Sequence, residues 1–139
     1  MRIHSRIFRA SVRRFLEHEC APHHERWEEQ GHIDREAWNK AGTQGLLCPS
    51  IPEQYGGAGL DYVSLALVLE EIAAGDGGTS TIISVNNCPV CSIAMMYANE
   101  AQKEKWLRPL AQGEMLGAFA LTEPHTGSDA AALRTTAVP

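Results

Sequence analysis

Residues 118–129, which read AFALTEPHTGSD, are the part of the sequence whose residue types are best suited to hold a ligand. An apolar, strand-like run ends at Thr122. Pro124, two residues later, should end the strand and send the chain outward. Gly127 permits a turn with positive φ, which would point successive backbone N–H groups into one concavity, and Ser128 adds a hydroxyl donor beside them. These neutral donors beside an apolar strand would suit a flat apolar ring with an electron-rich edge and a phosphate tail, as in a flavin dinucleotide.

The same motif also fits a plainer description, in which a strand and a turn are followed by a Ser-Asp cap for the next element. A second glycine-rich stretch, GGAG at residues 56–59, is not a dinucleotide fingerprint, because no strand precedes it and the third glycine is missing. Spacing alone leaves both descriptions of the 118–129 motif open.

The chain contains four cysteines, Cys20, Cys48, Cys88 and Cys91. Cys88 and Cys91 form a C-x-x-C pair, but a thioredoxin-type redox site would need a βαβ setting and the surrounding sequence is helical. A zinc site would need a second pair, such as Cys20 with His23 or His24, and the spacing does not require these groups to meet. We therefore expect buried free thiols in a reduced compartment and no metal site.

Composition and charge narrow the class of protein. With 139 residues, of which 44% are apolar, the chain can bury a core and has the size of one domain or of one domain plus part of another. The formal net charge of -5 argues against nucleic acid as the main partner. No apolar run approaches the length of a membrane span.

The N-terminal stretch MRIHSRIFRASVRR carries five arginines and no acidic residue. This composition is typical of a mitochondrial presequence or of an amphipathic helix. We favour the helix, because apolar residues recur at helical spacing and the pattern continues without a break into FLEHEC. No apolar signal core is visible, which argues against secretion, so we expect a cytoplasmic location, or the mitochondrial matrix in a eukaryote.

Residues 1–113 have the pattern of a helical domain. The expected helices cover residues 3–20, 35–44, 62–75, 79–98 and 100–107. The third of these helices is apolar almost all round, which predicts a central, buried position. Pro89 should kink or restart the fourth helix, and Asn99 with Gln102 forms a candidate capping box for the fifth.

The character of the sequence changes at residue 114. MLGAFALTEP has the pattern of a buried strand, and LRTTAV that of a second strand. Because a two-stranded hairpin is barely stable alone, we expect residues 114–139 to be the first strands of a β domain that this chain does not complete. The expected fold class is therefore mainly α, with a helical domain over 1–113 followed by the truncated opening of a middle β domain.

The stretch GAFALTEPHTGSDA resembles the signature of the acyl-CoA dehydrogenase family, in which a strand leads to Thr-Glu-Pro, two further residues and Gly-Ser-Asp. Other segments are similar to the family in the same order along the chain. They are IFRASVRRFL, AGTQGLL, PEQYGGAGLDY, LEEIA and NEAQKEKWLRPLAQGE. The resemblance covers essentially the whole chain and implies the N-terminal helical domain and the opening of the β domain of an FAD enzyme.

Carried over by motif position, the resemblance assigns five cofactor-binding residues. Phe119, Leu121 and Thr122 would lie along the flavin ring, with Thr122 donating a hydrogen bond to its pyrimidine edge. Gly127 and Ser128 would meet the pyrophosphate, and Ser128 would also reach the thioester substrate. Parts of the helix at 80–96 would wall the cavity for the acyl chain.

The resemblance implies no catalytic residue in this chain, because the family's glutamate base belongs to a C-terminal helical bundle. Glu123 should not replace it, since neighbouring residues of a strand point in opposite directions. His125 departs from the family pattern, which favours a small residue there. It is either a solvated turn residue or an added positive charge near a phosphate.

The implied function is that of the N-terminal portion of an FAD-dependent acyl-CoA dehydrogenase, which oxidises acyl-CoA thioesters to 2,3-enoyl-CoA. Its partners would be acyl-CoA, an electron-transfer flavoprotein or similar acceptor, and further copies of itself in a homo-oligomer. The 139-residue chain alone is expected to be inactive. The alternatives are an acyl-CoA oxidase or flavin monooxygenase of the same fold and, from another class, a non-catalytic helical interaction module.

Overall fold

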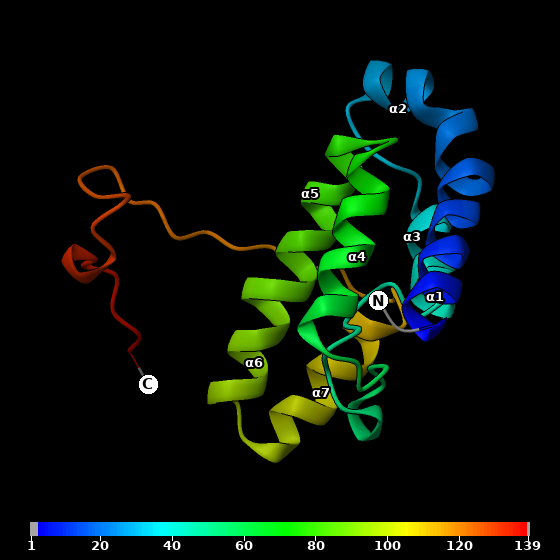
Figure 1. Cartoon of the computed structure of the whole chain (residues 1–139). Coiled ribbons are helices and arrows are strands. Elements are labelled where there is room, and N and C mark those ends of the chain that lie inside the picture. Colours follow the sequence, from blue (N-terminus) through cyan, green and yellow to red (C-terminus); the bar gives the residue numbers. More distant parts are fainter. Residues whose placement is uncertain (1–2, 139) are drawn as a thin grey trace.

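The computed structural model describes residues 3–138, with side chains from Arg6 onward, and this part of the chain is mainly helical. Its α-helices are α1 (Ile3–Phe15), α2 (His24–Gln30), α3 (Arg35–Thr43), α4 (Tyr62–Ala73), α5 (Gly77–Val85), α6 (Cys91–Tyr97) and α7 (Glu100–Ala111). Shorter turns are the 3₁₀ turns Ala21–His23, Glu53–Tyr55 and Ala130–Ala132 and the π turns Leu16–Cys20 and Asn86–Val90. The helices form one body, from which the chain after α7 runs out as an extended tail (Figure 1). None of the helices in the described chain is long and apolar enough to cross a membrane.

The main core lies among α1, α3, α4 and α5. Its fully buried side chains include Val12, Trp38, Val68, Ile72 and Ile83. Burial of a side chain of this size contributes roughly 1.5–3 kcal/mol. The central position predicted for the third helix is confirmed for one face of α4, whereas Tyr62 and Val63 at its start are exposed.

A second, smaller core places α6 and α7 beneath the loop that follows α3. It consists of Cys48, Ile51, Tyr55, Cys91, Leu107, Leu110 and Ala111. The capping box predicted for α7 is confirmed, since Asn99 accepts a hydrogen bond from the N–H of Gln102 at 2.9 Å and the Gln102 side chain accepts from the N–H of Asn99 at 3.0 Å. The start of α7 is therefore fixed by local contacts.

Helix α2 was not expected from the sequence. Its segment HERWEEQ is polar apart from Trp27, which is 4% exposed and belongs to the main core. Gly31 then ends the helix in the left-handed conformation, with φ of 75°. Trp27 is thus the one side chain that this short helix buries in the core, and a single apolar residue leaves no periodic pattern in the sequence.

Pro89 lies in the π turn that joins α5 to α6. A proline cannot donate the backbone hydrogen bond of an α-helix, and a π turn is a common way to absorb such an interruption. The interruption predicted at Pro89 is confirmed in this form. The two helices remain joined as one rod in Figure 1.

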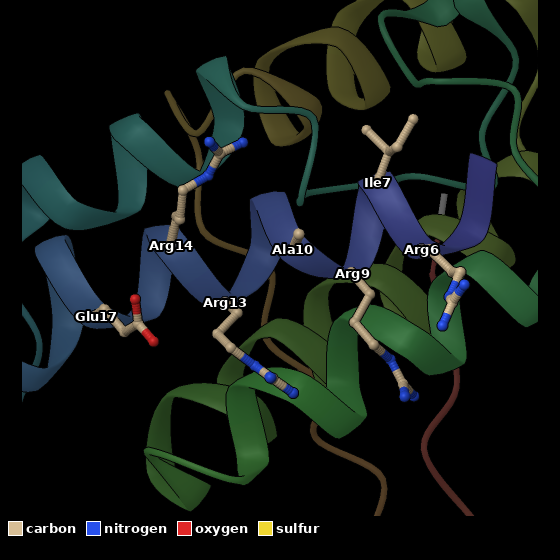
Figure 2. A pocket seen from close by; sticks show the side chains of 7 residues that line it. All are labelled: Arg6, Ile7, Arg9, Ala10, Arg13, Arg14 and Glu17. Carbon is tan, nitrogen blue, oxygen red and sulfur yellow. The ribbon is translucent and has the colours of Figure 1, made fainter. Parts of the chain in front are cut away.

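Two arginines of α1 pair with a buried acid of α4. Arg9 Nε lies 2.9 Å from Glu71 Oε1, and Arg13 Nη2 lies 2.8 Å from Glu71 Oε2. Glu71 is only 5% exposed, and Figure 2 shows Arg9 and Arg13 pointing to the same side of α1. The basic N-terminal segment thus packs as an amphipathic helix, which is the alternative favoured from its sequence.

The two strands expected after residue 114 are not formed. In the described part of the chain, residues 115–138 are extended or turned, and an isolated bridge between Glu123 and Thr126 is the sole β pairing. A β-strand requires a partner for its backbone N–H and C=O groups. Between residues 3 and 138, no second strand lies beside MLGAFALTEP, so this segment is extended without a ladder.

Candidate functional site

The 118–129 motif makes a tight turn with Pro124 and His125 at its tip. The N–H of Glu123 donates to the carbonyl of Thr126 at 2.9 Å, and the N–H of Thr126 donates back to the carbonyl of Glu123 at 3.1 Å. Proline favours such a turn because its φ is already fixed. The change of direction predicted at Pro124 is confirmed.

Thr122 and Gly127 lie side by side at the base of this turn. A Cβ atom added to Gly127 would stand 3.7 Å from Thr122 Cγ2 and 3.9 Å from Thr122 Oγ1, which is ordinary van der Waals contact. Ser128 follows directly, and the side chains of Thr122 and Ser128 are both exposed. Two hydroxyl groups and a small residue therefore stand together with their donors accessible.

The backbone conformation predicted for Gly127 is wrong. Within the described residues, the glycines with positive φ are Gly31, Gly45, Gly56, Gly59 and Gly113. A concavity of successive N–H groups needs a residue in the left-handed region, and Gly127 does not supply one. Within the described residues, an added Cβ atom at Gly127 would meet Thr122 only in ordinary contact.

The carboxylate of Glu123 is engaged within the tail. It accepts hydrogen bonds from the N–H of Arg134 at 2.9 Å and the N–H of Thr135 at 2.8 Å, and from the hydroxyl of Thr135. The Thr135 hydroxyl and the two backbone N–H groups lower the pKa of Glu123 below its ordinary value. Hydrogen bonds that favour the charged form make a carboxylate a weaker base, so Glu123 is poorly suited to remove a proton from carbon.

His125 is used inside the same turn. Its Nε2 atom lies 3.1 Å from the carbonyl oxygen of Ala132 and 3.3 Å from Glu123 Oε2. These contacts join the turn to the chain that follows it. His125 is an exposed residue of the turn, as in the first of the two alternatives considered from the sequence. No contact within the described residues tests the second, a positive charge near a phosphate.

An apolar groove of about 400 Å³ lies where the tail leaves the helical body. It is lined by Val90, Ile93, Ala94, Trp106, Leu110, Met115, Leu116, Gly117, Ala118 and Phe119. Its volume is within the range of small-molecule sites. Phe119 thus meets the helix that was expected to wall an acyl cavity, whereas Leu121, Thr122, Gly127 and Ser128 do not line the groove.

Two buried asparagines, missed in the sequence analysis, hold this region together. Asn86 Oδ1 accepts a hydrogen bond from the N–H of Gly117 at 3.0 Å, and Asn87 Oδ1 accepts one from the N–H of Cys48 at 2.8 Å. Asn87 Nδ2 also donates to the carbonyl of Leu46 at 3.0 Å. Both asparagines are fully buried. The signal that could have identified them is the pair of adjacent amides inside an otherwise apolar helix.

Asn86 sets the direction in which the tail leaves the body. A Cβ atom on Gly117 would stand 2.8 Å from Val90 Cγ1 and 2.9 Å from Asn86 Oδ1, so a larger residue could not approach as closely. The hydrogen bond and this close approach together pin the backbone two residues before Phe119. The position of the groove's rim is therefore controlled from the π turn between α5 and α6.

A basic hollow of about 650 Å³ lies along α1, away from the motif. Its lining residues are Arg6, Ile7, Arg9, Ala10, Arg13, Arg14 and Glu17 (Figure 2). Two of its four arginines are already paired with Glu71. Across the described chain, no group of three or more His, Cys, Asp or Glu side chains is placed to hold a metal ion.

Comparisons with known proteins point to one family. The sequence model "Acyl-CoA dehydrogenase, N-terminal domain" matches residues 4–114. An "Acyl-CoA dehydrogenase" of Bacillus subtilis is 43% identical over 132 residues, which is 95% of this chain and 35% of the relative. The "Long-chain specific acyl-CoA dehydrogenase, mitochondrial" of Mus musculus is 42% identical over 131 residues, which is 94% of this chain and 30% of the relative.

The fold comparison agrees. A glutaryl-CoA dehydrogenase from Mycobacterium smegmatis, solved in complex with FADH2, superposes with a TM-score of 0.91 at 35% identity. The match covers 97% of this chain and 35% of that structure. The chain thus spans about a third of the length of the proteins it matches.

Proposed function

Because the chain belongs to the acyl-CoA dehydrogenase family, we propose that the protein carrying it is an FAD-dependent acyl-CoA dehydrogenase. Such an enzyme oxidises an acyl-CoA thioester to the 2,3-enoyl-CoA. This chain would supply the helical domain and one edge of the flavin site. The observation that carries the proposal is that the segment which lines the apolar groove with Phe119 continues along the chain to the exposed hydroxyls of Thr122 and Ser128.

The domain division is part of this proposal. We assign residues 1–113 to the helical domain and residues 114–139 to the first strands of the middle β domain. Support comes from the extended backbone of residues 118–122, whose N–H and C=O groups make no hydrogen bond within the described chain and could pair with a further strand. It also comes from the length of the relatives, about three times that of this chain.

The residues of the motif fit one edge of a flavin. Phe119 and Leu121 are apolar and partly exposed, which suits the face of an aromatic ring. The carboxylate of the neighbouring residue, Glu123, accepts hydrogen bonds from the N–H groups of Arg134 and Thr135. Its negative charge is thus engaged within the tail. The motif residues would contact the flavin from one side, so they form only part of a flavin site.

In the proposed mechanism, FAD, when bound, would accept a hydride from the β carbon of the substrate. The Thr122 hydroxyl would donate a hydrogen bond to the pyrimidine edge of the flavin, where negative charge accumulates on reduction. Gly127 and Ser128 would hold the pyrophosphate, and Ser128 would also contact the thioester. The groove residues of α6 and α7 exclude water from the acyl chain. Removal of the α proton is not assigned to any residue of this chain.

The partners follow from the same proposal. They are an acyl-CoA, an electron-transfer flavoprotein or similar acceptor, and further copies of the protein in a homo-oligomer. The location proposed is the cytoplasm, or the mitochondrial matrix in a eukaryote. The isolated 139-residue chain is expected to be inactive, because the motif provides only one side of the flavin site.

Anaerobic titration of the purified full-length protein tests the proposed function. The protein should carry a flavin absorption band that bleaches when acyl-CoA thioesters of short, medium or long chain are added, with formation of the 2-enoyl-CoA. A protein that binds no flavin, or whose flavin is not reduced by any acyl-CoA, would overturn the proposal. Rapid reaction of the substrate-reduced flavin with oxygen would instead identify an oxidase.

A further inference from the structure

Two buried cysteines from distant parts of the chain meet in the smaller core. Cys48 Sγ and Cys91 Sγ are 2.7 Å apart, although the residues are separated by 43 positions in the sequence. Cys48 lies in the loop after α3, and Cys91 is the first residue of α6. Both side chains are fully buried, and both thiols are free. The sequence, despite the C-x-x-C spacing of Cys88 and Cys91, predicts free thiols and does not point to Cys48 as a partner of Cys91.

The loop that presents Cys48 is held tightly. Cys48 is the only non-glycine residue of the described chain with positive φ, at 54°. Such a conformation persists only where the surroundings enforce it, and it often marks a functional position. Here the buried Asn87 enforces it by accepting from the N–H of Cys48 at 2.8 Å and donating to the carbonyl of Leu46 at 3.0 Å. Asn86 Nδ2 also donates to Cys48 Sγ at 3.8 Å.

We propose that Cys48 and Cys91 are a redox modification site, at which hydrogen peroxide closes an intramolecular disulfide between the loop after α3 and the start of α6. A disulfide bond is about 2.05 Å long, so the two sulfur atoms need little movement to form it. The proposal does not depend on the proposed enzymatic function.

The chemistry balances with peroxide as the oxidant. One sulfur attacks peroxide to form a sulfenic acid and releases one water molecule. The second sulfur then attacks the sulfenic sulfur, forms the S–S bond and releases a second water molecule. Two S–H bonds are lost, one S–S bond is gained, and peroxide is reduced to two molecules of water.

Burial of the two thiols side by side makes the oxidation slow and directs it to a bond between Cys48 and Cys91. The hydrogen bond with Cys91 and burial raise the pKa of Cys48 above its ordinary value, so the thiolate that reacts is scarce at neutral pH. Once one sulfur is oxidised, however, its neighbour is already in place and no other thiol need diffuse to it. The crosslink would fix Cys91 beside Val90 and Ala94, which line the apolar groove.

Peptide mapping of the peroxide-treated protein tests the proposal. After native treatment, free thiols are alkylated and the protein is cut with a glutamate-specific protease. Cleavage after Glu36, Glu53, Glu71 and Glu100 places Cys48 in peptide 37–53 and both Cys88 and Cys91 in peptide 72–100. We expect these two peptides to be joined, with the mass of two hydrogen atoms lost, and to separate on reduction.

Single variants assign the bond. Cys88→Ser should keep the joined peptides, because Cys88 is partly exposed and is not the partner of Cys48. Cys91→Ser should lose them. The wild-type and Cys88→Ser results stand even where Cys91→Ser fails to fold.

Three results would overturn the proposal. The first is loss of the joined peptides in Cys88→Ser, which would make Cys88 the partner. The second is a bond within peptide 72–100. The third is the absence of any bond under conditions that already oxidise the more exposed Cys88.

Discussion

Thr122 and Glu123 are neighbours in the sequence, yet their hydrogen bonds give them different roles. Glu123 is bound to Arg134 and Thr135, which keeps it charged and makes it a weak base. The Thr122 hydroxyl is exposed and, among residues 3–138, has no hydrogen-bond partner. Of the two side chains, Thr122 is therefore the one available to a ligand.

In the flavin-loaded full-length protein, Thr122→Val should lower the reduction potential of the flavin. The change removes the hydrogen bond proposed to stabilise the reduced, negatively charged ring. Loss of a hydrogen bond to a charged group costs about 1.5–3 kcal/mol, which is on the order of 30–65 mV for a two-electron couple. Spectroscopic titration against a reference dye measures the reduction potential of the bound flavin.

The matched control is Thr122→Ser, which keeps the hydroxyl and should leave the potential close to that of the wild type. Equal potentials for the wild type and Thr122→Val would show that the hydroxyl points away from the ring.

A second prediction at this scale concerns Glu71, the buried acid shared by Arg9 and Arg13. Glu71→Gln should lower the free energy of unfolding by about 1.5–3 kcal/mol, because a buried charged hydrogen-bond partner is lost. Urea denaturation measures the change. Glu70→Gln is the control, since Glu70 is exposed and its pair with Arg9 should contribute at most about 1 kcal/mol. Equal effects of the two changes would contradict the structure.

At the scale of elements, the sequence predicts helices well and the tail poorly. The helix that starts at Glu100 follows from its Asn99 cap and apolar period, which are local signals. α2 has no such period, because Trp27 is its one buried side chain. The segment MLGAFALTEP has a strand composition, but strand formation depends on partners that no residue from 3 to 138 provides.

Packing between α3 and the end of α7 gives a test at this scale. A Cβ atom on Gly42 of α3 would stand 2.4 Å from the carbonyl carbon of Gln112, so the two backbones touch directly. Gly42→Ala should therefore lower the free energy of unfolding by about 1–3 kcal/mol. Gly77→Ala is the control, because nothing lies within 4 Å of its added Cβ and its φ is ordinary. It should be neutral or stabilising by up to about 1 kcal/mol.

The start of α5 should respond to pH through Asp76. Burial raises the pKa of Asp76, but hydrogen bonds from the N–H and hydroxyl of Thr79, with a contribution from His24, hold it below the ordinary value. A carboxyl group whose pKa is lower in the folded state stabilises the protein above its unfolded pKa, near about 4. That contribution disappears as pH falls through the folded pKa.

Asp76→Asn keeps the cap but cannot titrate. The wild type should therefore exceed Asp76→Asn in unfolding free energy by the largest amount at about pH 6 and by less at about pH 3. Urea denaturation across this range measures it. A difference independent of pH would mean that Asp76 is not stabilised as a carboxylate.

At the scale of the whole molecule, the proposed site lies at the border between the helical body and the tail. Resemblance to the family supplied Phe119, Thr122 and Ser128 as candidates, because their types and order are retained. It did not supply Asn86, whose role depends on a hydrogen bond to Gly117, 31 positions away. The close approach of two such segments is a product of packing and cannot be read from local sequence.

Hydrogen exchange of the full-length protein with and without FAD tests the central claim most directly. The account predicts that flavin binding slows exchange of the backbone amides at residues 119–122 and 127–128. Amides in the middle of α4, already buried in the core, should change little. If these motif residues exchange at the same rate in both forms, they do not border the flavin, and the proposed site is wrong.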